Sequence, residues 1–280
     1  MLDAKDKKKH SVILVTDLTA AFDVVSHPLL LVKLNHIGFR GMSGRILASY
    51  LEDRYSYVEV QGFFSSLIKM PRLSVIQGSR LSGTFFTIYT LDVPKVNQIM
   101  KEPRLYKMLT GKELATSVDI EQESVAYVDD VHHVISGKSR EQIQKYINQL
   151  HMATIGFYNH NQLKINSSKT TFLEFKQKTK EDDKKDTLII HEEDGTQILP
   201  TQCIKILGFH TNPRMSLDTH LAKSMRKINM EKRSLNHIIP HMNMEQRKVI
   251  LSAKLKSIIE LTSSLDTCSD AERLYAWVCL

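Results

Sequence analysis

The sequence of 280 residues predicts an α+β fold, on two observations. Apolar runs typical of buried strands are interspersed with segments of helical periodicity. They do not follow the regular strand–helix rhythm of a doubly wound sheet, so a mixed architecture is favoured. The composition, 42% apolar and 25% charged, is that of an ordinary globular protein, and the chain is long enough for one large core or two smaller ones.

Composition and targeting signals exclude several classes of protein. The apolar runs, such as Val12 to Val15, are too short to span a bilayer, and the first ten residues are charged and lack the apolar core of a signal peptide. We therefore expect a soluble protein, nuclear or cytoplasmic, with no membrane partner. The three cysteines (Cys203, Cys268 and Cys279) fit no metal-binding spacing.

The first half of the chain begins with a buried strand, SVILVTD (11–17), in which aliphatic residues run together without a helical period. A helix follows, with Ser26 as N-cap, Pro28 in its first turn and Gly38 as its stop. Beyond it we expect a helix at 43–54, half-buried strands from 55 onward, a helix at 79–94 and an irregular insertion at 95–123 that could contain one helix.

The second half begins with a strand from about Val125 that carries Asp129 and Asp130. A helix capped by Ser139 follows, and its inward stripe is predicted to be Ile143, Tyr146, Ile147, Leu150 and Ala153. The remaining expected elements are two short strands joined by a turn (163–175), a charged loop (176–186), strands at 187–195 and 203–210, and helices at 217–237 and 244–261.

The net charge of +7 is concentrated in one part of the chain. Residues 214–256 contain ten Lys and Arg against three Asp and Glu, so the rest of the chain is neutral overall. On the predicted helix at 217–237, the cations Lys223, Arg226, Lys227 and Arg233 lie on the side opposite the apolar stripe. Such a face suits a polyanion, most simply nucleic acid, although a solvated helix surface has the same pattern.

Three carboxylates lie at predicted strand ends. Asp17 ends the first strand, and Asp129 and Asp130 end or turn the later one. Side-by-side carboxylates repel each other unless a cation lies between them, and Mg²⁺ prefers such hard oxygen ligands. Two such ions can stabilise the attacking and leaving oxygens of a phosphoryl transfer. The following pair, His132 and His133, does not suit zinc, because neighbouring strand residues point to opposite faces.

Five segments, in this order, resemble the motifs of reverse transcriptases from non-LTR (LINE-like) retrotransposons. They are DLTAAFDVVSHPLLLVKL, similar to motif A, SVIQGSRLSGTFFTIYTLDVP, similar to motif B, AYVDD, similar to motif C, NQLKINSSKTTFLEF, similar to motif D, and IKILGFHTNPRMSLDTHL, similar to motif E and the entry to the thumb. The ordered set covers about residues 11–222 and is far more specific than any one of its members.

The resemblance implies a polymerase site with two Mg²⁺ ions, for which Mn²⁺ could substitute. Asp17 and Asp129 would be metal ligands, Asp130 the third carboxylate, and the backbone carbonyl of Leu18 a ligand of the second ion. Lys169 matches the motif D lysine that is proposed to protonate the departing pyrophosphate. A surface lysine is the alternative interpretation of Lys169.

The same resemblance implies a set of substrate contacts. Phe22 matches the aromatic residue that excludes a 2′-hydroxyl, although a core phenylalanine would have the same pattern. Gln77, Gly78 and Ser79 match the motif B turn beside the template and the nascent base pair, where glycine permits a close backbone approach. The expected partners are an RNA template, a DNA primer or target DNA, and deoxynucleoside triphosphates.

The implied architecture is a palm at 1–210, a small antiparallel sheet backed by helices, followed by a thumb-like helical region at 211–262 and a tail at 263–280. Family members carry a fingers region before motif A, whereas here sixteen residues precede Asp17. Motif B also departs from the family, because Ser74 and Ile76 replace its usual Gly and Pro. We therefore expect a palm and thumb fragment whose polymerase activity is impaired. The alternatives are an inactive remnant that only binds nucleic acid and an RNA-dependent RNA polymerase, against which Phe22 and the YVDD box argue.

Overall fold

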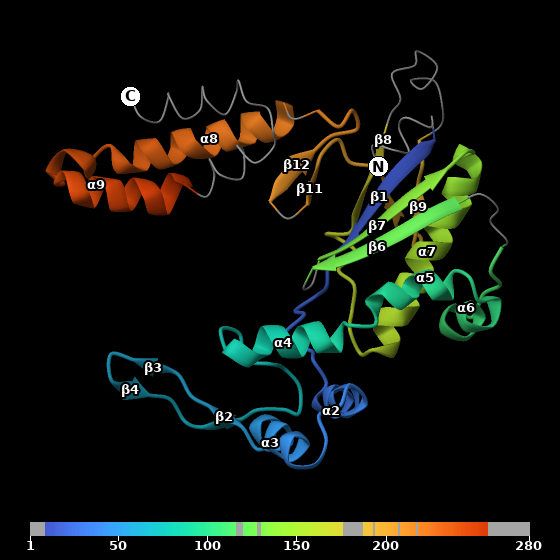
Figure 1. Cartoon of the computed structure of the whole chain (residues 1–280), viewed down its shortest axis with the longest axis horizontal. Coiled ribbons are helices and arrows are strands. Elements are labelled where there is room, and N and C mark those ends of the chain that lie inside the picture. The colour runs from blue at the N-terminus through green and yellow to red at the C-terminus, as the bar shows by residue number, and fades with distance from the viewer. Residues whose placement is uncertain are drawn as a thin grey trace. The chain divides into compact units, whose positions relative to one another are not determined.

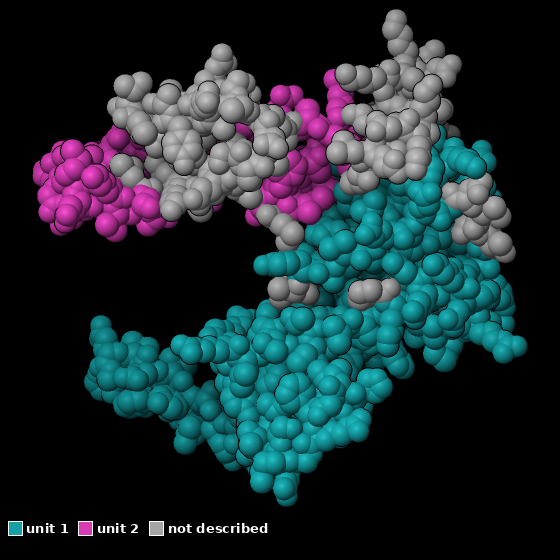
Figure 2. All heavy atoms as spheres, in the orientation of Figure 1, with its two compact units in different colours: residues 1–174, 183–200 teal, residues 175–182, 201–280 magenta. Residues whose placement is uncertain are grey.

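The computed structural model describes residues 9–115, 120–127, 130–175, 187–192, 194–206, 208–216 and 218–256. Its chain divides into two compact units, coloured separately in Figure 2. Unit 1 comprises residues 1–174 and 183–200, and unit 2 comprises 175–182 and 201–280. Each unit is described by itself. Within the described ranges, no helix combines the length and apolarity needed to cross a membrane.

The sheet of unit 1 has four strands in the order β6–β7–β1–β8 (Figure 1). Their bounds are β1 His10–Thr16, β6 Ile120–Tyr127, β7 Asp130–Gly137 and β8 Thr171–Phe175. Strand β7 pairs antiparallel with β1 on one side and with β6 on the other. The central β1 is buried over most of its length, as its continuous apolar run predicts. The antiparallel sheet and its helices confirm the predicted α+β class.

Helix α7 (Arg140–His160) contributes most of the layer that buries one face of this sheet. All five residues predicted for its inward stripe are buried. Gly156 lets α6 (Pro103–Thr110) come close, because a Cβ at Gly156 would lie 2.7 Å from the carbonyl oxygen of Leu109. Only a glycine fits this helix contact without displacing backbone atoms.

The other helices of unit 1 lie between β1 and β6 in sequence. They are α2 His27–His36, α3 Gly41–Leu51, α4 Arg80–Tyr89, the 3₁₀ turn η1 Val93–Lys95, α5 Val96–Ile99 and α6. Ser26 is the N-cap of α2, as predicted, although its side chain makes no capping hydrogen bond. The prediction of an irregular insertion at 95–123 was wrong in part, because its described residues form α5, α6 and the start of β6.

Residues 55–69 form a narrow hairpin that we call the exposed ribbon. Its outer pair is β2 (Tyr55–Ser56) with β5 (Ile68–Lys69), and its inner pair is β3 (Glu59–Val60) with β4 (Phe63–Phe64). Half-buried strands were predicted here, but every residue of these four strands is exposed, and Phe63 retains 80% of its accessible surface. The alternating sequence was therefore correct for strand and wrong for burial.

A short hairpin completes unit 1, formed by β9 (Ile190–His191) and β10 (Gln197–Ile198). Unit 2 contains the pair β11 (Ile204–Ile206) and β12 (Phe209–Thr211) and the long helix α8 (Asp218–Leu235). It continues through the 3₁₀ turn η3 (Ile239–His241), α9 (Met244–Leu251) and a π-helical turn, Ser252–Lys256. Asn243 and Gln246 form a capping box at the start of α9.

Candidate polymerase site and nucleic-acid surface

The carboxylates predicted from strand ends meet at one end of the sheet. Thr16 is the last residue of β1 and pairs with Val131 of β7. Asp17 follows Thr16, and Asp130 precedes Val131, so the two aspartates adjoin at the same end of neighbouring strands. If this pairing continued by one residue, Asp17 would face Asp130 and both carboxylates would lie on one face of the sheet.

Asp129 lies outside the described residues, together with Val128. Among the described residues, Tyr127 ends β6 and pairs with Asp130 at the start of β7. Within the described residues, no group of three or more His, Cys, Asp and Glu side chains could hold a metal ion. The two described carboxylates are therefore only part of the predicted set of three.

Lys169, the predicted motif D lysine, lies beside Asp17 of motif A. The segment after Asp17 pairs with residues 164–166, since Asn166 N–H donates to the Asp17 carbonyl at 2.8 Å and Thr19 N–H to the Lys164 carbonyl at 2.8 Å. A turn then brings Lys169 Nζ to 3.2 Å from Asp17 Oδ2. The lysine side chain is 65% exposed, and that of the aspartate 21%.

Two oxygens beside this contact belong to the predicted metal ligands. Asp17 Oδ2 is buried and accepts no hydrogen bond, so its contact with Lys169 is an ion pair alone. Leu18 lies opposite Ile165 in a narrow antiparallel bridge whose hydrogen bonds are made by its neighbours. In such a bridge, the carbonyl of Leu18 points away from residues 164–166.

The predicted substrate contacts occupy the segments that follow. Phe22 is partly buried, and its ring stacks on that of Phe86 in α4 at 4.9 Å between centroids. Ser79 is the N-cap of α4 and accepts a hydrogen bond from the N–H of Leu81 at 3.3 Å. Gln77 and Gly78 are exposed just before this cap. Gly78 has a φ of +86° while a Cβ there would meet nothing within 4 Å, so its backbone conformation, and not space, requires glycine.

Two residues that hold this turn were missed at the level of sequence. Tyr50 of α3 forms a hydrogen bond between its hydroxyl and Ser79 Oγ at 2.9 Å. Arg54 Nη2 donates to Ser74 Oγ at 3.2 Å. No local pattern in the sequence indicates that Tyr50 has a partner 29 residues away.

Ser74 has a φ of +79°, at the position where the resembling family has glycine. We expect Ser74→Gly to raise the free energy of unfolding by at most about 1 kcal/mol. Relief of roughly 1–2 kcal/mol of backbone strain is offset in part by the entropy cost of glycine, about 0.5–1 kcal/mol, and by loss of the hydrogen bond from Arg54, about 0.5 kcal/mol or more. Urea titration measures the change. Ser66→Gly is the control, at an exposed position without a positive φ, and it should be destabilising. If the two substitutions change the free energy of unfolding equally, Ser74 is not strained.

Behind the β6–β7 hairpin lies a buried polar network centred on His133. Its Nδ1 lies 2.6 Å from Ser124 Oγ, and its Nε2 lies 3.5 Å from Thr154 Oγ1 of α7. Ser124 in turn donates to Asn97 Oδ1 of α5 at 2.6 Å. The network thus ties both strands that carry the YVDD segment to the helices behind them. Burial, with smaller contributions from His132 and His151, lowers the pKa of His133 to about 3.

This burial predicts a loss of stability in mild acid. The unfolded chain protonates His133 near pH 6.5, whereas the folded chain does not until about pH 3. Below about pH 6 the unfolded state therefore gains about 1.4 kcal/mol per pH unit from this residue. We expect His133→Gln to be less stable at pH 7 but to lose less stability between pH 7 and pH 5, as measured by thermal melting. Exposed His36→Gln is the control, and an unchanged pH slope in His133→Gln would contradict the assignment.

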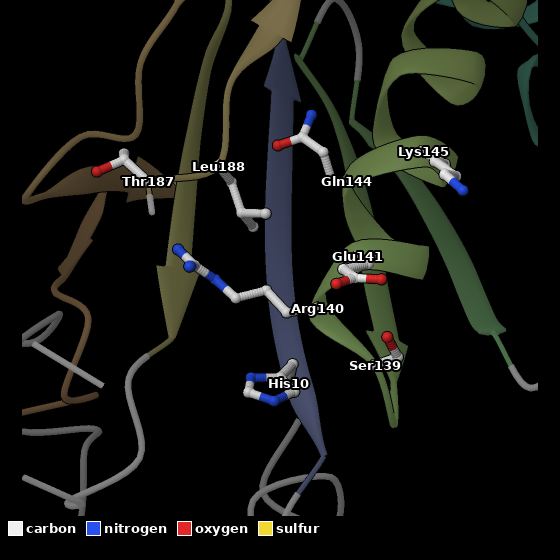
Figure 3. A pocket seen from close by; sticks show the side chains of 8 residues that line it. All are labelled: His10, Ser139, Arg140, Glu141, Gln144, Lys145, Thr187 and Leu188. Atoms are coloured by element: carbon white, nitrogen blue, oxygen red, sulfur yellow. The ribbon is translucent and has the colours of Figure 1, made fainter. Parts of the chain in front are cut away.

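A separate hollow of about 710 Å³ lies at the opposite end of β1 (Figure 3). Its lining residues are His10, Ser139, Arg140, Glu141, Gln144, Lys145, Thr187 and Leu188. Arg140 bonds both carboxylate oxygens of Glu174, at 2.6 and 2.8 Å, which balances its charge. Because His10 begins the strand that Asp17 follows, this hollow is roughly 20 Å from the carboxylates and is not part of their site.

Unit 2 presents the predicted basic surface on α8. Lys223, Arg226, Lys227 and Arg233 are all exposed. The helix buries its other side through His220, Ser224, Ile228 and Leu235. Lys223 is the most constrained of the four, since its Nζ lies 3.4 Å from Cys203 Sγ and 3.2 Å from His210 Nδ1. The pattern is that of an amphipathic helix with a cationic outer face.

Comparison with known proteins gives one matching family model and several relatives. The family model "Reverse transcriptase (RNA-dependent DNA polymerase)" matches residues 2–211. The RNA-directed DNA polymerase from mobile element jockey of Drosophila melanogaster is 32% identical over 139 residues, which are 49% of this chain and 13% of that protein. The probable RNA-directed DNA polymerase from transposon BS of the same species is 27% identical over 228 residues, 81% of this chain and 23% of that protein.

The chain therefore spans less than a quarter of the length of either relative. Among solved structures, apo telomerase from Candida tropicalis, truncated from its C-terminal domain, is similar at 16% identity and a TM-score of 0.46. That likeness covers 78% of this chain and 37% of the other.

Proposed function

Because the chain belongs to the reverse transcriptase (RNA-dependent DNA polymerase) family, we propose that it is a palm and thumb-like part of a non-LTR retrotransposon polymerase. Its reaction is the addition of deoxynucleotides to a DNA primer or target end on an RNA template. The observation that carries this proposal is the meeting of Asp17, Asp130 and Lys169 at one end of the sheet. These residues come from three motifs, with 113 positions between Asp17 and Asp130 and 39 between Asp130 and Lys169.

The residues at the sheet end suit divalent cations. Asp17 Oδ2 is buried without a hydrogen bond, its counter-charge is the largely exposed Lys169, and Asp130 adjoins it, so a cation between the two carboxylates would relieve their repulsion. Use of divalent metal is general in the family. For this chain we propose two Mg²⁺ ions, with Mn²⁺ as a substitute, held by Asp17, Asp129, Asp130 and the Leu18 carbonyl. When bound, such ions stabilise the charge on the attacking and leaving oxygens.

The surrounding side chains would orient the substrates. Gln77, Gly78 and Ser79 precede and cap α4, so the exposed backbone of this turn is available to a nucleotide and its template base. Lys169 pairs with Asp17 and is largely exposed, so its ammonium can move from the carboxylate to a departing pyrophosphate and donate a proton there. The cations of α8 would contact backbone phosphates, which predicts binding with a steep salt dependence and little sequence preference.

A primer-extension assay tests the proposal directly. The chain is given a DNA primer on an RNA template, with Mg²⁺ and either deoxynucleoside or ribonucleoside triphosphates. Extension with deoxynucleotides alone supports the proposal. Binding of primer–template without extension would identify a nucleic-acid-binding remnant, and extension with ribonucleotides would identify an RNA polymerase.

Phe22 provides a test of sugar selection. We expect Phe22→Val to increase the incorporation of ribonucleotides relative to deoxynucleotides, because the smaller side chain leaves room for a 2′-hydroxyl. The same primers with mixed nucleotides measure the ratio. Phe86→Leu, which shortens the partner of the Phe22 stack, is the control for loosened packing. An unchanged ratio in Phe22→Val would show that Phe22 serves packing alone.

A further inference from the structure

Tyr50, near the end of α3, makes two contacts with the start of α4. Its hydroxyl lies 2.9 Å from Ser79 Oγ, in a hydrogen bond between residues that are 29 positions apart. Its ring packs at a tilt against that of Phe85, with 5.9 Å between the ring centroids. Tyr50 therefore holds the end of the motif B turn (77–79) by one apolar contact and one hydrogen bond.

The hydroxyl of Tyr50 is needed neither for packing nor for capping. A phenylalanine ring could make the same contact with Phe85. Ser79 caps α4 without help, because its Oγ accepts a hydrogen bond from the Leu81 N–H at 3.3 Å. A serine hydroxyl has one hydrogen and two lone pairs, so it can take part in both bonds at once. What the Tyr50 hydroxyl adds is a fixed orientation of the Ser79 side chain.

The chain that leads into the turn is held from the other side. Arg54 Nη2 donates to Ser74 Oγ at 3.2 Å. The N–H of Val75 donates to the carbonyl of Phe22, the residue proposed above to select the sugar, at 2.8 Å. Residues 77 and 78 lie between these attachments and Ser79, and both are exposed. The exposed tip of the turn is therefore fastened on each side.

We propose that Tyr50 is a positioning residue for the incoming deoxynucleotide and acts through Ser79. Its hydrogen bond keeps the exposed backbone of residues 77 and 78 in one orientation before the nucleotide arrives, so less conformational freedom is lost on binding. Asp17 and Lys169 are held by other elements, so loss of this bond should weaken nucleotide binding and spare the chemical step. The inference rests on the proposed function and names a residue that prepares its substrate site.

Tyr50→Phe tests the proposal, because it removes the hydroxyl and keeps the ring. In primer extension by the full chain on an RNA template, we expect the KM for deoxynucleotide to rise roughly two- to tenfold, the effect of one neutral hydrogen bond. The kcat should change by less than about twofold, since binding and not chemistry is affected. Tyr57→Phe, which removes the hydroxyl of an exposed tyrosine on the ribbon, is the matched control and should change neither constant.

Ser79→Ala tests whether Tyr50 acts through Ser79. This variant should raise the KM at least as much as Tyr50→Phe does, because Ser79 also caps α4. Adding Tyr50→Phe to Ser79→Ala should then raise the KM by less than about a further twofold, because the hydrogen bond is already absent. If the two effects on the KM multiply in full, Tyr50 acts by another route and the proposal is wrong.

Hydrogen–deuterium exchange measures the turn without reference to activity. In Tyr50→Phe we expect faster exchange of the amides in residues 76–82 and unchanged exchange in β1 and α7, since only local opening becomes easier. Tyr57→Phe should leave the exchange of residues 76–82 unchanged. Thermal melting of each variant verifies that the chain remains folded, and faster exchange throughout unit 1 in Tyr50→Phe would show that the hydroxyl serves general stability instead.

The outcomes separate the inference from the function on which it rests. If the unsubstituted chain extends primers and Tyr50→Phe leaves the KM unchanged, the inference is overturned and the proposed function stands. If the unsubstituted chain does not extend primers, the proposed function fails, and the exchange measurement alone decides whether Tyr50 positions the turn. Unchanged exchange of residues 76–82 in Tyr50→Phe overturns the inference in either case.

Discussion

Asp17→Asn is expected to abolish primer extension while leaving the protein folded. Replacing a carboxylate that binds the metal should reduce activity by more than the roughly 10- to 100-fold that is typical when a residue that only contacts a metal ligand is replaced. The fold should tolerate the change, because Asp17 Oδ2 accepts no hydrogen bond and its ion pair with the exposed Lys169 is worth at most about 1 kcal/mol. Extension at increasing Mg²⁺ and a thermal melt measure the two effects separately.

The control for this experiment is Asp23→Asn. Asp23 is exposed, lies in the same motif and has no assigned part in catalysis, so it should retain extension. If Asp17→Asn unfolds the chain, the carboxylate is structural. If the Asp17→Asn variant extends primers as well as the unsubstituted chain does, the assignment of Asp17 to the metal site is wrong.

Lys33→Met is expected to reduce the free energy of unfolding by about 1.5–4.5 kcal/mol, because three hydrogen bonds of a part-buried ammonium, each worth about 0.5–1.5 kcal/mol, are lost. The substitution leaves the Tyr89 carbonyl, Asn161 Oδ1 and Asp92 Oδ1 without their shared donor in a site where the lysine side chain is 16% exposed. Urea unfolding measures the loss.

Two further variants make this result specific. Lys95→Met, at an exposed position, should change the free energy of unfolding little. Adding Asp92→Asn to Lys33→Met should recover part of the loss, because it removes the carboxylate left without its cation. A loss below about 1 kcal/mol in Lys33→Met would show that water replaces the ammonium without cost.

Elements with strong local patterns were predictable from the sequence. The apolar run of β1 and the helical stripe of α7 specify their own burial, and both predictions are confirmed. The exposed ribbon shows the limit of this reasoning, because alternation predicts strands without saying whether another element covers them. The helix α5 was missed because it is short and because Val96 and Ile99 are buried by tertiary contacts. The helix α6 does carry local signals, Pro103 in its first turn and Gly111 at its C-cap, and these were overlooked.

The candidate site was predictable in a different way. The order of the five motifs predicted the family, which the matches confirm. Neither periodicity nor composition could bring Lys169 to Asp17, since their contact depends on the pairing of residues 17–19 with 164–166. The hydrogen bonds of Lys33 and the His133 network were not predicted, because the partners of these two residues come from several elements. Asp129 lies outside the described residues, so its role stays a prediction.

If a retrotransposon encodes this chain, as proposed, the tight contact of α6 and α7 has a consequence for how its genomic copies diverge. At Gly156 any side chain would collide with the backbone of Leu109, so nearly every missense change at this codon damages the folded product. The exposed positions of the ribbon carry no such constraint. In copies whose product is still under selection, the codon for Gly156 should therefore be retained while the codons for the ribbon drift. Copies that have lost function should accumulate changes at both places at the same rate.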